Sequence, residues 1–216
     1  MPKALNAPMT SARQTTLFDS PACETLLSLD GEVRLYRHWL PTAMADTCLR
    51  DCITTLEWQQ SRIRIHGHEH AIPRLNAWYG DPGCAYRYSG ARFDPLPWTD
   101  TLADIRQRLA ATLGITFNSV LANRYRDGRD SVAWHSDDEP ELGHNPVIAS
   151  VSLGATRRFT LKHKSRKEVP TLAVDLTHGS LLVMAGPTQH HWLHQVAKTT
   201  RIVDERVNLT FRYIFQ

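Results

Sequence analysis

Apolar positions recur at two different spacings along the chain, and the change of spacing divides it into two parts. Between Pro41 and about Gln60, apolar residues return every three or four positions, which predicts an amphipathic helix with Thr42 as its N-cap. A second helix is expected over Thr99–Leu113, where leucines and an isoleucine share one face. Between the helices, residues 61–97 predict short strands separated by turns that contain Gly and Pro.

After Gly114 the pattern changes to short runs that are β-branched or alternating, with turn signals between them. Runs such as NSVLANRY, PVIASVSLG and VNLTFRYIF are typical of an antiparallel sandwich or barrel. We therefore expect a mostly β fold with flanking helices (α+β), in which the helices come first and the sandwich continues to the C-terminus. Residues 1–25 are polar and predict a flexible leader, and residues 26–216 are expected to form a single domain.

Composition and charge exclude several classes of protein. With 42% hydrophobic and 22% charged residues, the chain matches an ordinary globular protein, so extended disorder is not expected. No run approaches the roughly 20 apolar residues of a membrane span, and the N-terminal segment lacks the apolar core of a secretory signal. We expect a cytoplasmic monomer without membrane contact. The net charge of +3 permits a polyanionic partner but does not require one.

The segment WHSDDEPE places a histidine directly before a group of acidic side chains. His135 and Asp137 lie two residues apart, so on a strand both point to the same side. A third donor is available in QHHWLHQ, where His194 is the candidate and His190 and His191 compete with it. Two histidines and one carboxylate, with other positions open, form the ligand set of non-haem Fe(II) oxygenases. A solvated turn is the alternative, because His-x-Asp is a short pattern that chance supplies often.

The strand RVNLTFR has an unusual polar face. Alternation gives this face the residues Arg206, Asn208, Thr210 and Arg212. Arginines inside a small sandwich need an anion, and a guanidinium group grips carboxylates bidentately, so a bound dicarboxylate is one interpretation. The other is that the arginines face solvent and the apolar face is the core. In NRY, Asn123 and Tyr125 either face the same interior or lie exposed on an edge strand.

Together the segments NRYRDG, WHSDDEPE, IASVSLGATRRF, GSLLVMAGPTQHHWLH and RVNLTFR resemble the AlkB family of Fe(II)- and 2-oxoglutarate-dependent dioxygenases, and most closely the members that repair double-stranded DNA. The resemblance covers about residues 62–214. It implies a double-stranded β-helix, a jelly-roll variant, with a core at about 115–216 and an N-terminal nucleotide-recognition lid at about 60–97. With Fe(II), 2-oxoglutarate and O₂, such an enzyme demethylates 1-methyladenine and 3-methylcytosine and releases formaldehyde, succinate and CO₂.

The resemblance also implies roles for individual residues. It makes His135, Asp137 and His194 the iron ligands. The residues that it places around 2-oxoglutarate are Asn123, Tyr125, Arg206, Asn208 and Arg212. Those that it places around a flipped base are Arg74, Tyr86, Tyr88, Asp138 and Glu139. Tyr88 would stack on this base and Asp138 would attract its positive charge. Without the resemblance, the tyrosines are equally well ordinary rim residues and Glu139 a solvated charge.

The expected partner is alkylated DNA, double- or single-stranded. The basic segment RRFTLKHKSRKE and the residues after His194 predict contacts with phosphates. The residues expected to make these contacts are Arg157, Lys162, Lys164, Arg166, Lys167 and Lys198. A charge run of this kind is usually a solvated face, but its place beside the expected base pocket favours DNA.

Three features keep alternatives open. The duplex-repair relatives carry a bulky apolar finger where this chain has His66, so single-stranded DNA or RNA is an alternative substrate. In the leader, Gln14, Leu17 and Phe18 fit the loose pattern of peptides that dock on bacterial sliding clamps; the alternative is that they pack onto the domain. A metal-binding sandwich that binds nucleic acid without catalysis is the alternative outside enzymes, and the complete ligand set disfavours it.

Overall fold

The computed structural model describes the chain from residue 22 to residue 215, except residues 66, 85, 89 and 90; for 63–65, 86–88 and 91–93 it describes the backbone only. Gln14, Leu17, Phe18 and His66 therefore lie outside the described residues, as do the side chains of Tyr86 and Tyr88.

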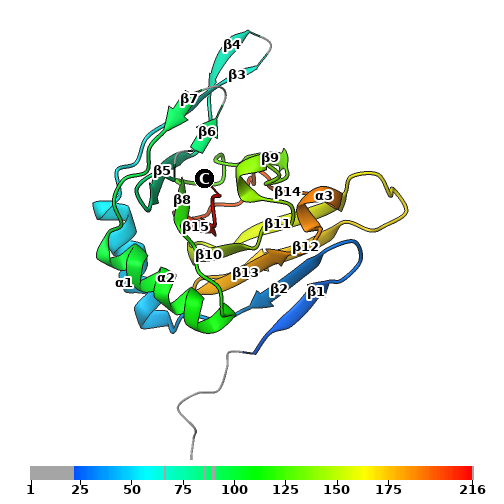
Figure 1. Cartoon of the computed structure of the whole chain (residues 1–216), viewed down its shortest axis with the longest axis horizontal. Coiled ribbons are helices and arrows are strands. Elements are labelled where there is room, and N and C mark those ends of the chain that lie inside the picture. The colour runs from blue at the N-terminus through cyan, green and yellow to red at the C-terminus, as the bar shows by residue number, and fades with distance from the viewer. Residues whose placement is uncertain (1–21, 66, 85, 89–90, 216) are drawn as a thin grey trace, which may run out of the picture.

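Two facing antiparallel sheets form the body of the molecule (Figure 1). The larger sheet consists of β1 (Glu24–Leu27), β2 (Glu32–Tyr36), β5 (Leu75–Gly80), β8 (Ser119–Tyr125), β10 (Ile148–Gly154), β13 (Ser180–Ala185) and β15 (Arg206–Arg212). The smaller sheet consists of β9 (Val132–His135), β11 (Arg157–His163), β12 (Leu172–Leu176) and β14 (Trp192–Val196). Their strand orders are β1-β2-β13-β10-β15-β8-β5 and β12-β11-β14-β9. The expected jelly-roll sandwich is confirmed.

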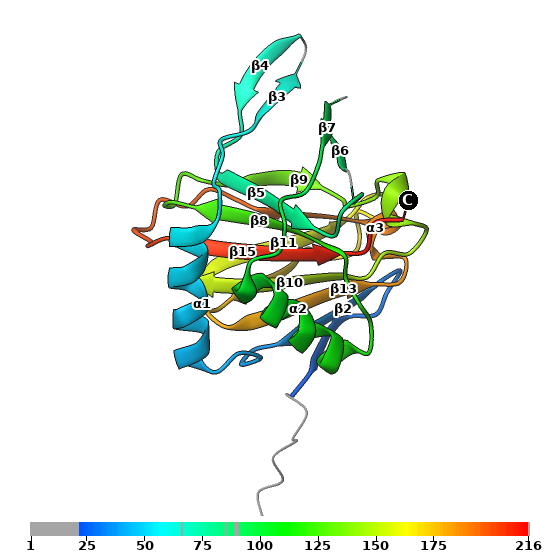
Figure 2. The same ribbon diagram turned by 60° about the vertical axis from the view of Figure 1, so that its left-hand side comes forward.

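The two long helices, α1 (Thr42–Thr55) and α2 (Asp100–Leu113), cover the outer face of the larger sheet (Figure 2). Both lie where the apolar periodicity predicts them. Helix α2 has a side-chain cap, because the Oγ1 of Thr99 accepts a hydrogen bond from the N–H of Leu102. It ends at Gly114, whose positive φ of 70° is a conformation that glycine adopts without strain.

The prediction that Thr42 caps helix α1 is wrong. Pro41 is the N-cap and Thr42 is the first helical residue, and Pro41 makes no side-chain hydrogen bond to the helix. The fixed φ of proline suits the extended backbone of an N-cap, so the helix begins immediately after it. A hydroxyl near a helix start is therefore a weaker signal than the proline beside it.

Two strands precede helix α1, so the expectation that the helices come first is also wrong. Strand β2 pairs with β13, and β1 pairs with β2, which extends the larger sheet at one edge. Val33 and Leu35 alternate with polar residues and belong to the core between the sheets. The strands are only four and five residues long, and their pairing partner β13 lies far away in the sequence. Local pattern alone therefore gives them a weak signal.

Strand β15 lies between two apolar cores. Val207, Leu209 and Phe211 belong to the outer core, beneath the two helices. The second core lies between the sheets and contains residues such as Phe159 and Trp192. Because side chains alternate along a strand, the polar face of β15 is turned into the space between the sheets.

Two hairpins project beyond the sandwich, next to its β5 edge (Figures 1 and 2). One pairs β3 (Arg62–Ile65) with β4 (His68–Ala71), and the other pairs β6 (Tyr86–Tyr88) with β7 (Ala91–Phe93). The short strands expected within residues 61–97 are confirmed. The two ribbons are separate from the two sheets of the sandwich. Of the helices in the described part of the chain, none is long and apolar enough to cross a bilayer.

We predict that Thr99→Ala lowers the free energy of unfolding by about 1 kcal/mol, because an N–H at the start of α2 loses its acceptor. Urea unfolding followed by circular dichroism measures the change. Thr42→Ala is the matched control: its side chain makes no cap, so the midpoint should move by less than about a quarter of the Thr99→Ala shift. Equal losses in both variants would contradict the assignment of the caps.

Candidate active site

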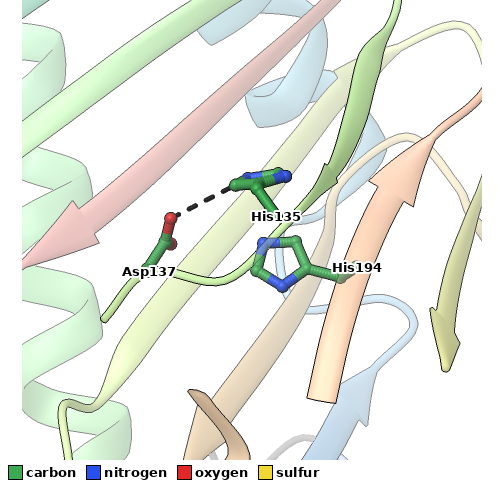
Figure 3. A group of neighbouring side chains, drawn as sticks. All are labelled: His135, Asp137 and His194. Atoms are coloured by element: carbon green, nitrogen blue, oxygen red, sulfur yellow. Dashed lines mark ion pairs between the residues drawn. The ribbon is translucent and has the colours of Figure 1, made fainter. Parts of the chain in front are cut away.

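His135, Asp137 and His194 lie together at one end of the smaller sheet (Figure 3). His135 is the last residue of β9 and pairs directly with His194 of β14. Asp137 follows two residues later, outside the strand. The possible ligand atoms of the three side chains all lie within 4.8 Å of one another, and His135 Nε2 is 3.8 Å from Asp137 Oδ1. This spacing fits a single metal ion.

The protonation states of the cluster also suit a metal. Burial raises the pKa of the Asp137 carboxyl, but the charge of the adjacent Arg212, with further contributions from His194 and His135, outweighs burial and holds this pKa well below its ordinary value. Burial, and then the neighbouring His135, lower the pKa of His194 to about 3. The Nδ1 of His135 lies 2.8 Å from the carbonyl of Ala133, which can only accept, so Nδ1 is the donor there and Nε2 is the nitrogen that faces Asp137. At neutral pH, the site therefore offers the carboxylate of Asp137 and the neutral imidazole of His194.

The neighbouring histidines of QHHWLHQ lie elsewhere. Both His190 and His191 are exposed and belong to the short helix α3 (Thr188–His191). The His190 ring contacts the ring and carbonyl of His144, and the His191 ring stacks on His163 at 5.8 Å. Of the three candidates, His194 is the one that the fold brings to His135 and Asp137.

Arg206 and Arg212 are both buried, which excludes the alternative that they face solvent. Arg212 donates to Asp137 Oδ2 at 2.9 Å. Arg206 is 1% exposed and its Nη2 donates to Ser152 Oγ at 2.9 Å. Its Nε and Nη1 are buried and have no hydrogen-bond partner among the described residues. A guanidinium group in this state calls for an anion, and a carboxylate fits its geometry.

One cavity between the sheets connects the metal cluster with Arg206. Its polar lining consists of Arg74, Asn123, Tyr125, His135, Asp137, Ser150, His194, Arg206, Asn208, Thr210 and Arg212. Phe159, Met184 and Val196 contribute to its apolar lining. The cavity therefore offers metal ligands at one place and a buried cation at another, which suits a small anion that also binds the metal.

Comparison with known proteins decides the family. The family described as the 2OG-Fe(II) oxygenase superfamily matches residues 32–212. The chain belongs to this superfamily. It is accordingly a dioxygenase that uses Fe(II), 2-oxoglutarate and O₂, and the buried, unpaired nitrogens of Arg206 beside a His-Asp-His cluster fit that cofactor set.

Within the superfamily, this oxygenase is similar to proteins named as AlkB homologues. It is 41% identical over 181 residues to the Mus musculus protein named DNA oxidative demethylase ALKBH2, covering 80% of this chain and 76% of that protein. The Homo sapiens protein of the same name is 43% identical over 160 residues, with 71% and 61% covered. The Homo sapiens protein named Alpha-ketoglutarate-dependent dioxygenase alkB homolog 3 is 40% identical over 193 residues, with 86% and 67% covered. The resemblance to the AlkB family is confirmed.

A solved structure shares the fold of the oxygenase. The structure described as "The structure of OsALKBH1" has a TM-score of 0.55 and 17% sequence identity, and the match covers 87% of this chain and 99% of that one. At this identity the likeness concerns the fold alone.

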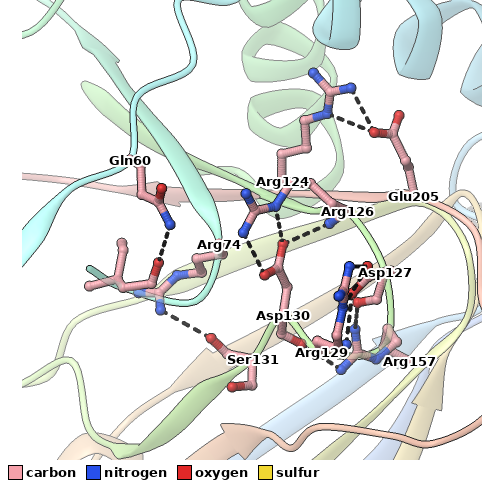
Figure 4. A network of polar contacts seen from close by, with 11 residues as sticks. Gln60, Arg74, Arg124, Arg126, Asp127, Arg129, Asp130, Ser131, Arg157 and Glu205 are labelled. Atoms are coloured by element: carbon pink, nitrogen blue, oxygen red, sulfur yellow. Dashed lines mark hydrogen bonds and ion pairs between the residues drawn. The ribbon is translucent and has the colours of Figure 1, made fainter. Parts of the chain in front are cut away.

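Arg74 reaches the oxygenase cavity from the segment before β5 (Figure 4). Its Nε donates to Asn123 Oδ1 at 2.7 Å and its Nη1 to the carbonyl of Ser131 at 3.2 Å. Arg74 thus orients Asn123 and ties the hairpin side of the molecule to the loop before β9. The sequence resemblance predicted that Arg74 lies near the flipped base. It did not predict the hydrogen bond from Arg74 to Asn123.

The acidic turn after Asp137 lies beside the cavity. The Asp138 side chain is 51% exposed, and its Oδ2 accepts from Ser136 Oγ at 2.9 Å and from Lys164 Nζ at 3.2 Å. Glu139 is half-buried and directly precedes the short 3₁₀ turn Pro140–Leu142, with no side-chain hydrogen bond to that turn. The two interpretations of WHSDDEPE therefore apply to different residues. His135 and Asp137 belong to the metal cluster, and Asp138 lies in a solvated turn.

Arg157 is not a phosphate-binding residue, which corrects the sequence prediction. It is 3% exposed, and its Nη atoms donate to the carbonyls of Asp127 and Asp130 at 3.1 and 2.9 Å (Figure 4). Its Nη2 also donates to the carbonyl of Ala197 at 2.7 Å. Its guanidinium carbon lies 5.6 Å from the centre of the Tyr125 ring, and that of Arg206 lies 5.1 Å from the same ring. Arg157 therefore joins two loops over Tyr125, because alternation along β11 turns it inward.

The other basic residues remain on the surface to different degrees. Lys162 is half-buried, with its Nζ 4.4 Å from the centre of the Trp134 ring. Arg166 is exposed and pairs with Asp30 and Glu168. Lys167 and Lys198 are exposed. Contacts of these residues with phosphate stay predictions.

Three site residues were missed by sequence reasoning. Ser150 and Ser152 accept hydrogen bonds from Asn208 and Arg206, and Gln189 accepts one from the backbone of Asp137. The serines could have been found, because polar residues at i and i+2 in the apolar run IASVSLG indicate a polar face. Gln189 has no such local signal, since its role depends on a contact across 52 residues.

We predict that Arg157→Met lowers the free energy of unfolding by at least about 2 kcal/mol, because it removes the donors to three carbonyls and leaves buried acceptors unsatisfied. Chemical denaturation measures the loss. Arg158→Met is the neighbouring control: this side chain is 62% exposed and pairs with Asp175, so less than about 0.5 kcal/mol should be lost. A stable Arg157→Met variant with weakened DNA binding would restore the phosphate-contact assignment.

Proposed function

We propose that this oxygenase removes methyl groups from the ring nitrogens of DNA bases, with 1-methyladenine and 3-methylcytosine as substrates. The main support is the single cavity that contains both the His135–Asp137–His194 cluster and the guanidinium of Arg206, two of whose nitrogens have no partner among the described residues. The substrate class is supported by the relatives named DNA oxidative demethylase. The aligned part covers 58–76% of the lengths of the mouse, cattle and human ALKBH2 proteins. The activity and substrate named for these relatives are therefore assigned to this chain as a proposal.

His135, Asp137 and His194 are assigned as the ligands of Fe(II). Three protein ligands leave positions open for 2-oxoglutarate and O₂. When bound, iron with these co-substrates supplies the oxidising chemistry that hydroxylates an N-methyl group, and the resulting N-hydroxymethyl base releases formaldehyde. The protein keeps Asp137 ionised through its ion pair with Arg212, so the ligand set carries one negative charge before metal arrives.

The polar face of β15 is assigned to 2-oxoglutarate. Arg206 has the free donors for the distal carboxylate, and Tyr125 lies beside it. Arg212 pairs with the metal ligand Asp137 and lines the same cavity, so it is assigned to the part of the keto acid that would bind the iron. Asn208 bonds to Ser150 Oγ at 2.7 Å and accepts from Thr210, and Asn123 is held by Arg74. These contacts orient the wall around the co-substrate in advance.

The damaged base is assigned to the space beside the acidic turn. The methylated bases are cations, so the exposed carboxylate of Asp138 would favour them over neutral normal bases. Arg74, Tyr86, Tyr88 and Glu139 are proposed to complete this site, with the two hairpins as the cover that excludes water. In the free protein, Lys164 shares the carboxylate of Asp138, so a cationic base competes with an internal cation for it.

DNA phosphates are assigned to five basic residues at the surface, of which four are exposed and Lys162 is half-buried. The candidates are Lys162, Lys164, Arg166, Lys167 and Lys198. Each phosphate contact releases counterions, so binding should weaken as salt increases. The contact of Gln14, Leu17 and Phe18 with a sliding clamp and the monomeric state are proposed on the sequence alone.

Turnover of methylated oligonucleotides tests the function. The Fe(II)-loaded protein with 2-oxoglutarate should release formaldehyde from 1-methyladenine and 3-methylcytosine in DNA, measured beside single-stranded, double-stranded and RNA versions of the same sequence. Asp137→Ala should abolish turnover, because it removes a ligand. Formaldehyde from RNA alone would reject a DNA substrate, and no turnover with iron bound would favour a non-catalytic metal-binding protein.

We predict that Asp138→Asn reduces the preference for cationic bases. The ratio of kcat/KM for 3-methylcytosine, a cation, to that for neutral 3-methylthymine should fall about fivefold, since a charge pair at about 4 Å in water is worth about 1 kcal/mol. Glu141→Gln, a change of the same kind in the same turn, serves as the control and should leave the ratio unchanged. An unchanged ratio in Asp138→Asn would exclude recognition of the charge by this carboxylate.

A further inference from the structure

The backbone leaves the sheet just before the third member of the metal cluster. His135 ends β9 and pairs with His194, so the sheet itself sets the separation of the two histidines. Asp137 lies two residues beyond, in a segment that is neither strand nor helix. Its position therefore depends on contacts other than the strand ladder.

Gln189 makes such a contact. Its side chain is buried, with 1% of the residue exposed, and its Oε1 accepts a hydrogen bond from the backbone N–H of Asp137 at 2.9 Å. Because a backbone N–H can only donate, the amide must present its oxygen here, and its Nε2 then faces the sulfur of Met184 at 3.6 Å. The bond replaces the ladder contact that the chain loses at the end of β9.

The short helix that carries Gln189 is itself firmly attached. Thr188 accepts a hydrogen bond from the N–H of Glu32 at 2.8 Å and donates to the carbonyl of Ala185. The carbonyl of Gln189 accepts from Lys164 Nζ at 2.8 Å, and the same Nζ lies 3.2 Å from Asp138 Oδ2. Gln189 is thus connected to two consecutive residues. It contacts Asp137 directly, and Lys164 connects it to Asp138 in the acidic turn.

We propose that Gln189 is a positioning residue for the metal-binding carboxylate of Asp137. The proposal rests on the assignment of His135, Asp137 and His194 as iron ligands made above. Arg212 orients the carboxylate from the β15 side, and Gln189 fixes the backbone from which the carboxylate extends. Groups that hold metal ligands in place typically contribute about 10–100-fold to metal affinity.

Cobalt(II) binding to the full chain tests this role without relying on activity. The metal-free protein is titrated with Co(II) in the presence of 2-oxoglutarate, and visible absorption reports both affinity and coordination geometry. Gln189→Met keeps the size and the unbranched shape of the side chain but removes the amide oxygen. Gln195→Met is the matched control, because it makes the same change on β14 next to His194 and at the alternate face of the strand.

The expected result is that Gln189→Met weakens Co(II) binding at least about tenfold and alters the absorption bands, whereas Gln195→Met stays within threefold of the unsubstituted chain. Co(II) affinity and bands unchanged in Gln189→Met would overturn the proposal, and so would equal losses in both variants. If Gln189→Met does not fold, Gln189→Asn, whose amide is one methylene too short to reach Asp137, is judged by the same criteria.

Asp137→Ala separates this proposal from the one on which it rests. If the unsubstituted chain binds no Co(II), or if Asp137→Ala binds it equally well, the ligand assignment fails and the role of Gln189 fails with it. If Asp137→Ala loses binding while Gln189→Met retains it, the ligand assignment stands and only the positioning role is rejected.

Discussion

Two arginine side chains buried between the sheets impose the constraint on which the rest of this site depends. A guanidinium group removed from water needs an anion, and one face of β15 carries two such groups. Arg212 finds its anion within the chain, in the carboxylate of Asp137. Arg206 has a serine hydroxyl and the ring of Tyr125 as neighbours, and two of its nitrogens have no acceptor in the described part of the chain. Arg212 thus keeps the metal ligand Asp137 ionised, and Arg206 provides a binding position for the carboxylate of a small acid.

The metal cluster is positioned in two different ways. The two histidines stand opposite each other on paired strands, so backbone hydrogen bonds alone hold them near one another. Asp137 lies past the end of the strand and is held by Gln189 from one side and Arg212 from the other. Lys164 connects the carbonyl of Gln189 to the carboxylate of Asp138. The acidic turn and the metal cluster are therefore parts of one connected structure.

Much of the fold could be predicted because its signals are local. The helical periodicity located α1 and α2, and the alternating runs after Gly114 indicated a sandwich. Two of the errors have a common cause. Arg157 lies in a run of basic residues that suggested a DNA-binding surface, but it is buried, and the strands β1 and β2 depend on β13, far along the chain. In each case a distant partner, invisible in the local pattern, decides the outcome.

The sequence by itself determined which residues share a strand face, because alternation is a property of the extended backbone: Arg206 with Arg212 on β15, and Asn123 with Tyr125 on β8. Alternation does not account for the position of Asp137, which lies beyond the end of β9. The sequence could not decide whether those faces meet solvent or protein. Only the tertiary structure did so, since β15 is covered by helices on its apolar side and by the second sheet on its polar side. The choice of His194 over its neighbours by geometry, and the contact from Gln189 to Asp137, likewise required segments that are distant in the sequence to be packed together.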